Sequence, residues 1–330
     1  MRLRDVFLKV GLVKIFESEQ GSVKGIPNLI LLVGSGLIGK PIDDLLHREG
    51  YRDTSVPFRW GQTCEGFQPV FTCLESSMHE WSILSENISS HIAIIWAAGI
   101  CCFNSSDRET EIERNDFISF IECLVLFINK HPGCEVHFHF ISSAGGLFEG
   151  GGFVDADATP SPVRPYGKLK LWQEQYLFSL SSFITHVYRP SSVYGKIKSS
   201  LRRNLIGVLI KGAILGEFCQ ISGSLHTLRD YIHAEDVAFL VVDGVLKDKS
   251  HHDNSIALLA SFKPTSIFEV LSMVESITHH HIYFRLEPEP GNALDITFAR
   301  PTNWYMGSAR MPMTLDVGIK RVSDSWVSHL

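Results

Sequence analysis

Apolar runs separated by helix-like patterns fill the first half of the chain. Residues 28–33 and 91–96 are almost continuously apolar, and residues 135–141 alternate between apolar and polar. Continuous apolar runs are typical of strands that are buried on both faces of a parallel sheet. Helical periodicity follows at residues 40–49 and 109–130. Strands and helices in this order indicate a doubly wound α/β fold.

The pattern changes after about residue 196, although helices and strands continue to follow one another. We expect helices at 201–214, 236–246 and 266–277, and strands at 218–221, 254–259 and 282–286. In the first half, we expect residues 61–80 to be loop-rich.

Residues 1–27 precede the first clear strand. Their first 16 residues mix Lys and Arg with large apolar residues, and they lack the uninterrupted apolar core and small-residue cleavage site of a signal peptide. We expect a packed or partly disordered extension here, and the alternative is a helix that lies on a membrane surface. No apolar run reaches the length of about 18 residues that a membrane-spanning helix needs, so stable membrane insertion is not expected.

Composition narrows the classes of function. Hydrophobic residues make up 45% of the 330 residues and charged residues 20%, which is an ordinary globular balance. The net charge of -6, without a basic stripe, argues against a nucleic-acid binder. Seven cysteines without paired spacing fit reduced thiols in a cytoplasmic protein better than a disulfide framework.

A glycine-rich segment follows the first strand directly and precedes the first helix. In this context glycines permit a tight turn and let the backbone approach a pyrophosphate, while the helix N-terminus adds N–H groups and a partial positive charge. A glycine-rich turn of another α/β protein is the plainer alternative. We expect a dinucleotide cofactor at Gly34, Ser35, Gly36, Leu37, Ile38 and Gly39.

The end of the second strand predicts which dinucleotide binds. In NAD sites an acidic residue usually binds the ribose hydroxyls about 20 residues after the last glycine, but residues 55–60 contain none and include Arg59. A guanidinium group binds a 2′-phosphate with two hydrogen bonds. NADP(H) is therefore favoured and NAD(H) is the alternative, and an Arg59 that is solvated or stacks on the adenine would not read the phosphate.

Polar groups suited to proton transfer follow two later elements. Ser142 and Ser143 end the strand expected at 135–141, and Tyr166 and Lys170 begin a helix at a spacing that places them on one face. An ammonium group beside a phenol favours the phenolate, and a serine hydroxyl can bind a substrate carbonyl or alkoxide. Small residues at another strand end let a ligand lie against the backbone: Ala97, Ala98 and Gly99.

A metal site is not expected. His137 and His139 lie two residues apart on one face of an expected strand, but no third ligand has a suitable spacing. Hydrogen bonds within the fold are the better explanation for these histidines.

Seven motifs occur in the order found in a known family. They are Val33-Gly-Ser-Gly-Leu-Ile-Gly39, Ala97-Ala-Gly99, Asn115, Ser142-Ser-Ala-Gly-Gly-Leu-Phe148, Tyr166-Gly-Lys-Leu-Lys170, Tyr188-Arg-Pro-Ser-Ser-Val-Tyr-Gly195 and Leu228-Arg-Asp-Tyr-Ile-His-Ala-Glu-Asp-Val237. With them, residues 28–330 resemble the extended short-chain dehydrogenase/reductases, in particular the NAD(P)-dependent epimerase/dehydratase group that acts on nucleotide sugars.

The resemblance implies a Rossmann domain at residues 28–190 and a smaller, mainly substrate-binding domain at 191–330 that is interleaved with it. It implies a cytoplasmic homodimer that acts on a nucleotide sugar. Enzymes of polysaccharide biosynthesis are of this kind. It makes Tyr166, Lys170 and Ser143 or Ser142 catalytic. It adds cofactor residues Asn115, Lys170 and Arg189, and substrate residues Ser192, Arg229 and Arg300.

Departures from the family pattern refine the expected reaction. Ala144 stands where many epimerases carry the catalytic hydroxyl, and the acidic pair of dehydratases is missing after the strand end, so elimination is disfavoured. We expect reduction of a keto group of a nucleotide sugar. A 4-epimerase with tightly bound NAD(P) is the close alternative, and a non-catalytic NADP-binding regulator is the alternative of another class.

Overall fold

The computed structural model describes residues 10–18, 27–59, 64–84, 91–155, 158–196, 204–247, 253–287, 294–300 and 311–327. The chain divides into two compact units. The first unit comprises Met1–Ser142, Arg164–Arg189 and Ala238–Ala257, and the second comprises Ser143–Val163, Pro190–Val237 and Leu258–Leu330. The chain therefore passes back and forth between the two units.

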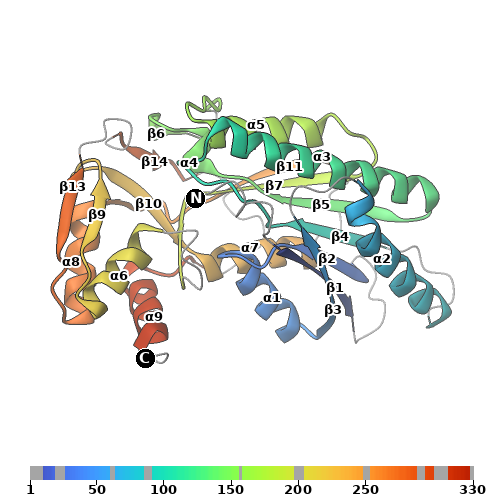
Figure 1. Cartoon of the computed structure of the whole chain (residues 1–330), viewed down its shortest axis with the longest axis horizontal. Helices are drawn as coiled ribbons and strands as arrows, with labels where there is room; N and C mark the ends of the chain where they lie inside the picture. Colours follow the sequence, from blue (N-terminus) through green and yellow to red (C-terminus); the bar gives the residue numbers. More distant parts are fainter. Residues whose placement is uncertain are drawn as a thin grey trace. The chain divides into compact units, whose positions relative to one another are not determined.

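A seven-stranded sheet forms the centre of the first unit (Figure 1), with the strand order β11-β7-β5-β4-β2-β1-β3. Its strands are β1 (Val10–Ser18), β2 (Leu29–Val33), β3 (Tyr51–Arg59), β4 (His91–Trp96), β5 (Glu135–Ile141), β7 (Ile184–Pro190) and β11 (Ser255–Leu259). The neighbours β2, β4, β5 and β7 run parallel. This confirms the predicted doubly wound α/β fold, in a sheet that is mostly parallel.

Helices cover both faces of this sheet (Figure 1). One face carries α2 (Cys64–Leu84), α3 (Asp107–Lys130) and α5 (Pro165–Phe178), and the other carries α1 (Gly39–Arg48) and α7 (Ala234–Lys247). The core under α2 and α3 is aromatic: the ring of Phe120 lies 5.4 Å from that of Phe67 and 4.8 Å from that of Trp96. Burial of these large rings contributes to the stability of this layer.

Helix α2 corrects the expectation of a loop-rich segment at 61–80. Phe67, Val70, Phe71 and Leu74 recur at helical spacing, and all four are buried. Pro69 lies inside the helix. Because proline lacks an N–H donor and usually breaks helices, it masked this period in the sequence.

Strand β1 lies within the stretch that was predicted to be an N-terminal extension. It runs antiparallel to both neighbours, pairing Val13 with Val33 of β2 and Val10 with Arg59 of β3. Residues 10–18 therefore form an internal strand, and the alternative of a membrane-surface helix is wrong for them. The rest of the predicted extension, at 1–9 and 19–26, lies outside the described residues. No helix in the described ranges is long and apolar enough to cross a membrane.

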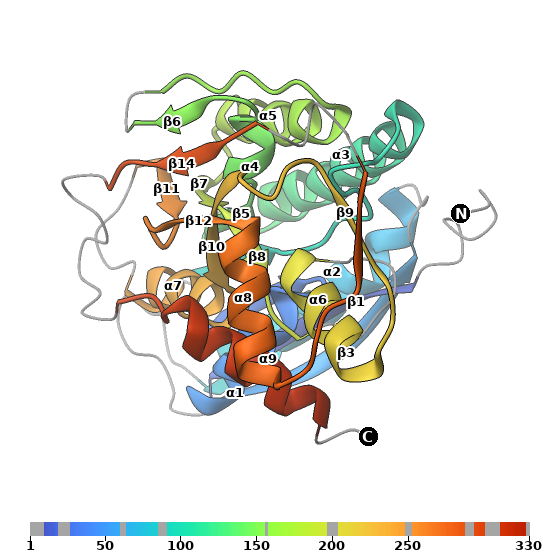
Figure 2. The same cartoon turned by 90° about the vertical axis from the view of Figure 1, so that its left-hand side faces the viewer.

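The second unit contains three small sheets and four helices in its described part (Figure 2). The sheets have the orders β12-β10-β8, β13-β9 and β14-β6. The strands are β6 (Gly152–Val154), β8 (Ser192–Tyr194), β9 (Cys219–Ser222), β10 (Leu228–His233), β12 (Pro264–Ser266), β13 (Phe284–Glu287) and β14 (Ile296–Phe298). The helices are α4 (Ala144–Leu147), α6 (Leu205–Leu215), α8 (Ile267–Thr278) and α9 (Leu315–Val327).

The core of the second unit lies between α6, α8 and α9. Ile210, Val274 and Ile319 are fully buried there and belong to one apolar cluster with Tyr194. The strands and helices predicted at 218–221, 236–246, 254–259, 266–277 and 282–286 are confirmed to within a few residues. The sequence did not predict the short strands β6, β8, β10, β12 and β14 or the helices α4 and α9.

Candidate functional site

The glycine turn between β2 and α1 has the geometry that the sequence predicted. Gly34 has a φ of 103°, which L-residues with a side chain rarely adopt, and a Cβ placed on it would lie 2.8 Å from the backbone of Ala98. A Cβ on Gly39 would clash with the Gly34 carbonyl oxygen. Both glycines are therefore required by close backbone packing.

The same turn leaves room for a ligand. A Cβ on Gly36 would meet no atom within 4 Å, and both Ser35 and Gly36 are exposed. Helix α1 has no side-chain cap at Ile38 and no acidic residue in its first turn. The backbone N–H groups of a helix start attract anions when no carboxylate occupies them. The turn thus fits a pyrophosphate between Gly36 and the start of α1.

A buried carboxylate lies under the end of β4. Glu113 on α3 is 0% exposed, and its Oε2 accepts hydrogen bonds from the backbone N–H groups of Ile100 and Cys101, both at 2.7 Å. A Cβ on Gly99 would lie 2.7 Å from Oε1 of Glu113. Burial, followed by the charge of Glu113, raises the pKa of the Cys101 thiol, so this thiol stays protonated at neutral pH.

The predicted catalytic pair lies on one face of α5, as its spacing indicated. Lys170 is 4% exposed and its Nζ lies 5.9 Å from the ring centroid of Tyr166, which is half-buried. The same Nζ lies 3.6 Å from Oε1 of Glu113 and 5.0 Å from the ring centroid of Phe140. An ammonium buried in this way needs a counter-charge, and Glu113 supplies it. Sequence reasoning missed Glu113.

Ser142 is engaged in a buried polar triad. Its hydroxyl donates to Oε1 of Glu174 at 2.5 Å, and Arg189 binds both oxygens of the same carboxylate, from Nε at 3.1 Å and from Nη2 at 2.6 Å. Glu174 and Ser142 are both buried. Ser142 and Arg189 are thus brought together by Glu174, a residue that the sequence analysis did not select.

The other predicted residues with a substrate or catalytic role belong to the second unit. Ser143 is half-buried and caps α4, where its Oγ accepts a hydrogen bond from the Gly146 N–H at 3.1 Å. Ser192 begins β8 and pairs with Tyr231 of β10. Arg229 also lies on β10, where its Nη1 donates to the carbonyl oxygens of Leu228, at 3.0 Å, and Leu294.

Arg300, which directly follows β14 in the second unit, is exposed. Its guanidinium carbon lies 5.6 Å from the ring centroid of Phe262. At this distance the electron-rich face of the ring attracts the guanidinium cation.

Two predicted cofactor residues lie elsewhere than the sequence suggested. Asn115 is on the exposed side of α3, whereas Glu113, two residues earlier, is on the buried side. Arg59 ends β3, but the strand next to the glycine-bearing β2 is β1. Arg59 is therefore one strand further from the turn than the prediction assumed.

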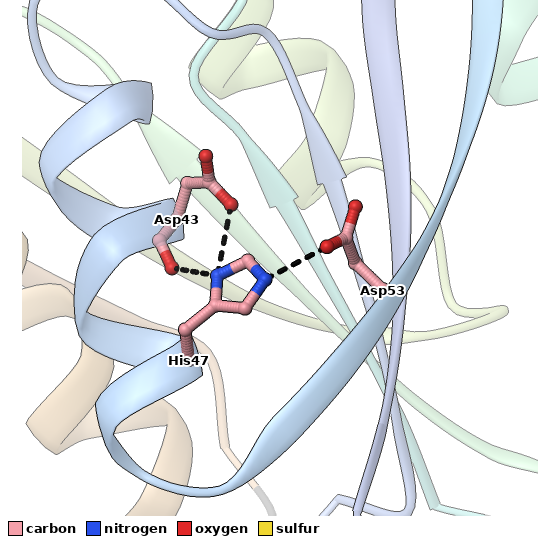
Figure 3. Close-up of side chains that lie close together, drawn as sticks. All are labelled: Asp43, His47 and Asp53. Carbon is pink, nitrogen blue, oxygen red and sulfur yellow. Dashed lines mark hydrogen bonds and ion pairs between the residues drawn. The ribbon is translucent and has the colours of Figure 1, made fainter.

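One group of three side chains in the described residues has the spacing of a metal site (Figure 3). Nitrogen or carboxylate atoms of Asp43, His47 and Asp53 lie within 4.8 Å of one another. Lys14 of β1, however, already binds both carboxylates, with its Nζ 2.8 Å from Asp43 and 3.1 Å from Asp53. Because the ammonium provides the positive charge that a cation would bring, we interpret this group as a structural ion-pair network.

His137 and His139 are held by hydrogen bonds within the sheet. Nδ1 of His137 lies 3.0 Å from Nε2 of His186, and Nδ1 of His139 lies 3.1 Å from the Tyr188 hydroxyl. His186 in turn lies 2.8 Å from the Ser255 hydroxyl. The histidines thus form a stacked row across β5 and β7, which accounts for their two-residue spacing.

The sequence of this chain matches a known protein family. Residues 30–255 match the model of the NAD dependent epimerase/dehydratase family. No curated protein sequence matches the chain.

Several solved structures share the fold at low identity. MoeE5, in complex with UDP-glucose and NAD, aligns with a TM-score of 0.69 and 19% identity over 90% of this chain and 97% of that one. A UDP-glucose 4-epimerase from Thermotoga maritima, with UDP-glucose, gives 0.66 and 18% over 89% and 97%. RMD from Pseudomonas aeruginosa, complexed with NADPH, gives 0.58 and 16% over 72% and 82%.

Proposed function

Because the chain belongs to the NAD dependent epimerase/dehydratase family, we propose that it is an NAD(P)-dependent oxidoreductase of nucleotide sugars and, more specifically, an NDP-sugar 4-epimerase. The observation that carries this proposal is the buried Lys170, which lies next to Tyr166 on α5 and is held by Glu113. Reduction of an NDP-keto sugar is the second candidate.

The glycine turn supports a dinucleotide cofactor. The open space at Gly36, the uncapped start of α1 and the small residues Ala97–Gly99 fit a pyrophosphate and its neighbouring ribose. When bound, such a cofactor accepts a hydride from a sugar carbinol carbon or returns one to a keto carbon. Every other role belongs to side chains of the protein.

Tyr166 is the proposed acid and base. Its phenolate form would remove the proton of the sugar hydroxyl during oxidation, and the phenol so formed would return that proton to the oxygen during reduction of the keto carbon. Lys170 is proposed to place its positive charge beside this side chain, with its Nζ 5.9 Å from the ring centroid of Tyr166. Ser143 is the proposed hydroxyl partner, because the hydroxyl of Ser142 already donates to Glu174, whereas Ser143 Oγ accepts from Gly146 and keeps its hydrogen for a substrate oxygen.

The order of the strands in the sheet favours an epimerase over a reductase. The sequence favoured a consumable NADPH because Arg59 ends the second strand, and that argument assumes that this strand borders the glycine turn. In the observed order β1 takes this place. UDP-sugar epimerases are also among the structures that share the fold. Arg229 and Arg300 are the proposed contacts of the sugar-nucleotide diphosphate.

The test is an assay of purified protein with a panel of UDP-, dTDP-, GDP- and CDP-sugars and their 4-keto derivatives. Interconversion of two 4-epimers without net consumption of added cofactor supports the epimerase. Stoichiometric oxidation of NADPH or NADH by a keto sugar supports the reductase instead. Cofactor binding without turnover of any substrate would support a non-catalytic NADP-binding regulator and overturn both.

A tyrosine pair on α5 provides the matched control. Tyr166→Phe is expected to lower kcat at least about a hundredfold, because it removes the acid/base hydroxyl. Tyr176→Phe, ten residues later on the same helix and stacked on Trp172 at 5.1 Å, is expected to keep kcat. Equal kcat values for the two variants would overturn the role of Tyr166.

A further inference from the structure

The insertion of β1 between β2 and β3 changes which residues border the adenosine half of a dinucleotide. In a doubly wound sheet the cofactor lies across the carboxyl ends of the strands, with its pyrophosphate at the glycine turn and its adenosine over the adjacent strand on the side away from the nicotinamide. That adjacent strand is normally the second one of the fold. Here it is β1, since the sheet order on that side is β2-β1-β3.

The register places a defined part of β1 at this edge. The Gly34 N–H donates to the Leu12 carbonyl oxygen at 2.9 Å, and Val13 pairs with Val33. Because β1 is antiparallel, its first residues, Val10 to Leu12, run along the edge at which β2 ends. Arg59 pairs with Val10 on the far side. Neighbouring strands are about 4.8 Å apart, so β3, the strand that carries Arg59, is spaced about 10 Å from β2 instead of about 5 Å.

β1 is held firmly in this position. Val13, Ile15 and Phe16 are fully buried. On the face toward α1, Lys14 binds Asp43 of α1 and Asp53 of β3, and the His47 ring lies 2.7 Å from Asp53 (Figure 3). This network joins β1, α1 and β3. It therefore fixes β1 between β2 and β3.

We propose that β1 is the strand that borders the adenosine ribose, so that residues Val10–Leu12, and not Arg59, determine whether a 2′-phosphate is accepted. This inference rests on the proposed dinucleotide-dependent function. The sequence Val10-Gly11-Leu12 has no ionisable residue. It offers neither a carboxylate, which would repel a 2′-phosphate, nor a guanidinium, which would bind it. A charge introduced there changes cofactor selectivity more than removal of the Arg59 charge does.

The experiment measures the dissociation constants of NAD⁺ and NADP⁺ by calorimetric titration of the full-length protein and four variants. Gly11→Asp adds a carboxylate to the segment Val10–Leu12, and Gly11→Asn is its uncharged match. The measured quantity is the dissociation constant of NADP⁺ divided by that of NAD⁺. This ratio is expected to be at least about tenfold higher in Gly11→Asp than in Gly11→Asn, because the carboxylate repels the 2′-phosphate. Arg59→Ala is expected to change that ratio less than Gly11→Asp does. Arg59→Lys, which keeps the charge, checks that any effect of Arg59→Ala is electrostatic.

The outcomes separate this inference from the proposed function. A larger change of the ratio in Arg59→Ala than in Gly11→Asp would assign the ribose to β3 and overturn the inference, and so would equal ratios in Gly11→Asp and Gly11→Asn. If the Gly11 variants do not fold, Val10→Asp and Val10→Asn place the same pair of groups at the neighbouring residue of β1. Failure of the wild-type protein to bind either dinucleotide would instead overturn the proposed function itself.

Discussion

Lys170 and Glu113 form an ion pair that is almost entirely closed to solvent. Their side chains are 6% and 1% exposed, and Nζ lies 3.6 Å from Oε1. The carboxylate is fixed from its other side by two backbone N–H groups that follow β4. Glu113 thus connects Lys170, which is proposed to assist Tyr166, to the end of β4, which is proposed to face the cofactor.

Removal of the carboxylate charge is expected to destabilise the fold. Glu113→Gln leaves the Lys170 ammonium buried without its counter-charge, and we expect the free energy of unfolding to fall by about 3 kcal/mol. Glu111→Gln, on the exposed side of the same helix, is expected to change it by less than about 0.5 kcal/mol. Urea denaturation measures both. Similar values for the two variants would mean that the pair contributes nothing to stability.

The two adjacent serines are expected to respond differently. Ser143→Ala should lower kcat about a hundredfold if its hydroxyl stabilises the developing alkoxide, with little change in stability. Ser142→Ala should instead lower the free energy of unfolding by about 1–3 kcal/mol, because Glu174 loses a buried hydrogen bond, and should leave kcat close to that of the wild type. Kinetics and urea denaturation of both variants check this, and the reverse pattern would transfer the catalytic role to Ser142.

The glycines of the turn offer a second contrast. Gly34→Ala forces a side chain into a left-handed conformation and against Ala98, so the cofactor-free protein should lose at least about 1–2 kcal/mol of stability. Gly36→Ala meets no protein atom within 4 Å and should fold normally while its dissociation constant for the dinucleotide rises. Thermal unfolding and binding titration distinguish the two effects. Normal affinity in Gly36→Ala would place the pyrophosphate elsewhere.

The network around β1 predicts a pH dependence of stability. A hydrogen bond to the backbone of Asp43, and then one to Asp53, raise the pKa of His47 above 6.5 against the effect of burial. The folded state therefore binds this proton more tightly than the unfolded state. The contribution is present below about pH 6.5 and disappears as the pH rises through the raised pKa. Relative to His47→Gln, the wild-type protein should lose stability over that rise, as measured by urea unfolding at several pH values.

The carboxylates of the same network act in the opposite direction. Burial opposes the ionisation of Asp43, but hydrogen bonds from Lys14 and Lys40 outweigh it and hold its pKa below 3.8. The contribution of Asp43 is therefore present above about pH 4 and disappears as the pH falls through the lowered pKa. Asp43→Asn should flatten the acid side of the stability profile. An unchanged acid limb would show that the network does not fasten β1.

Much of the first unit could be predicted because its signals are local. The run at 28–33, the glycines after it and the spacing of Tyr166 and Lys170 each specify an element or a face within a few residues. Helix α2 was missed because a helix-breaking residue lies inside it. Glu113 could have been found from helical periodicity, because it is spaced three, four and seven residues from Asp116, Phe117 and Phe120, which share the buried face of α3. The same periodicity places Asn115 off that face.

The position of β1 depends on partners that are distant in the sequence. Lys14 between Val13 and Ile15 is the alternation of a strand, but nothing near it indicates pairing with residues 29–33 on one side and 51–59 on the other. Those contacts are decided by which edges the rest of the sheet leaves open. For the same reason, residues 55–60 alone could not show that β1 separates the strand of Arg59 from β2.

The internal position of β1, between β2 and β3, matters for how the protein is produced and trimmed. The segment that matches the family begins at residue 30, so a fragment cut to that boundary would lack β1 and most of the residues that lead from it to β2. The edges of β2 and β3 that pair with β1 would then face solvent with unpaired N–H and C=O groups. Exposed edges of this kind recruit other chains. Self-association of such a fragment would therefore reflect the missing strand and would say nothing about the quaternary structure of the intact protein.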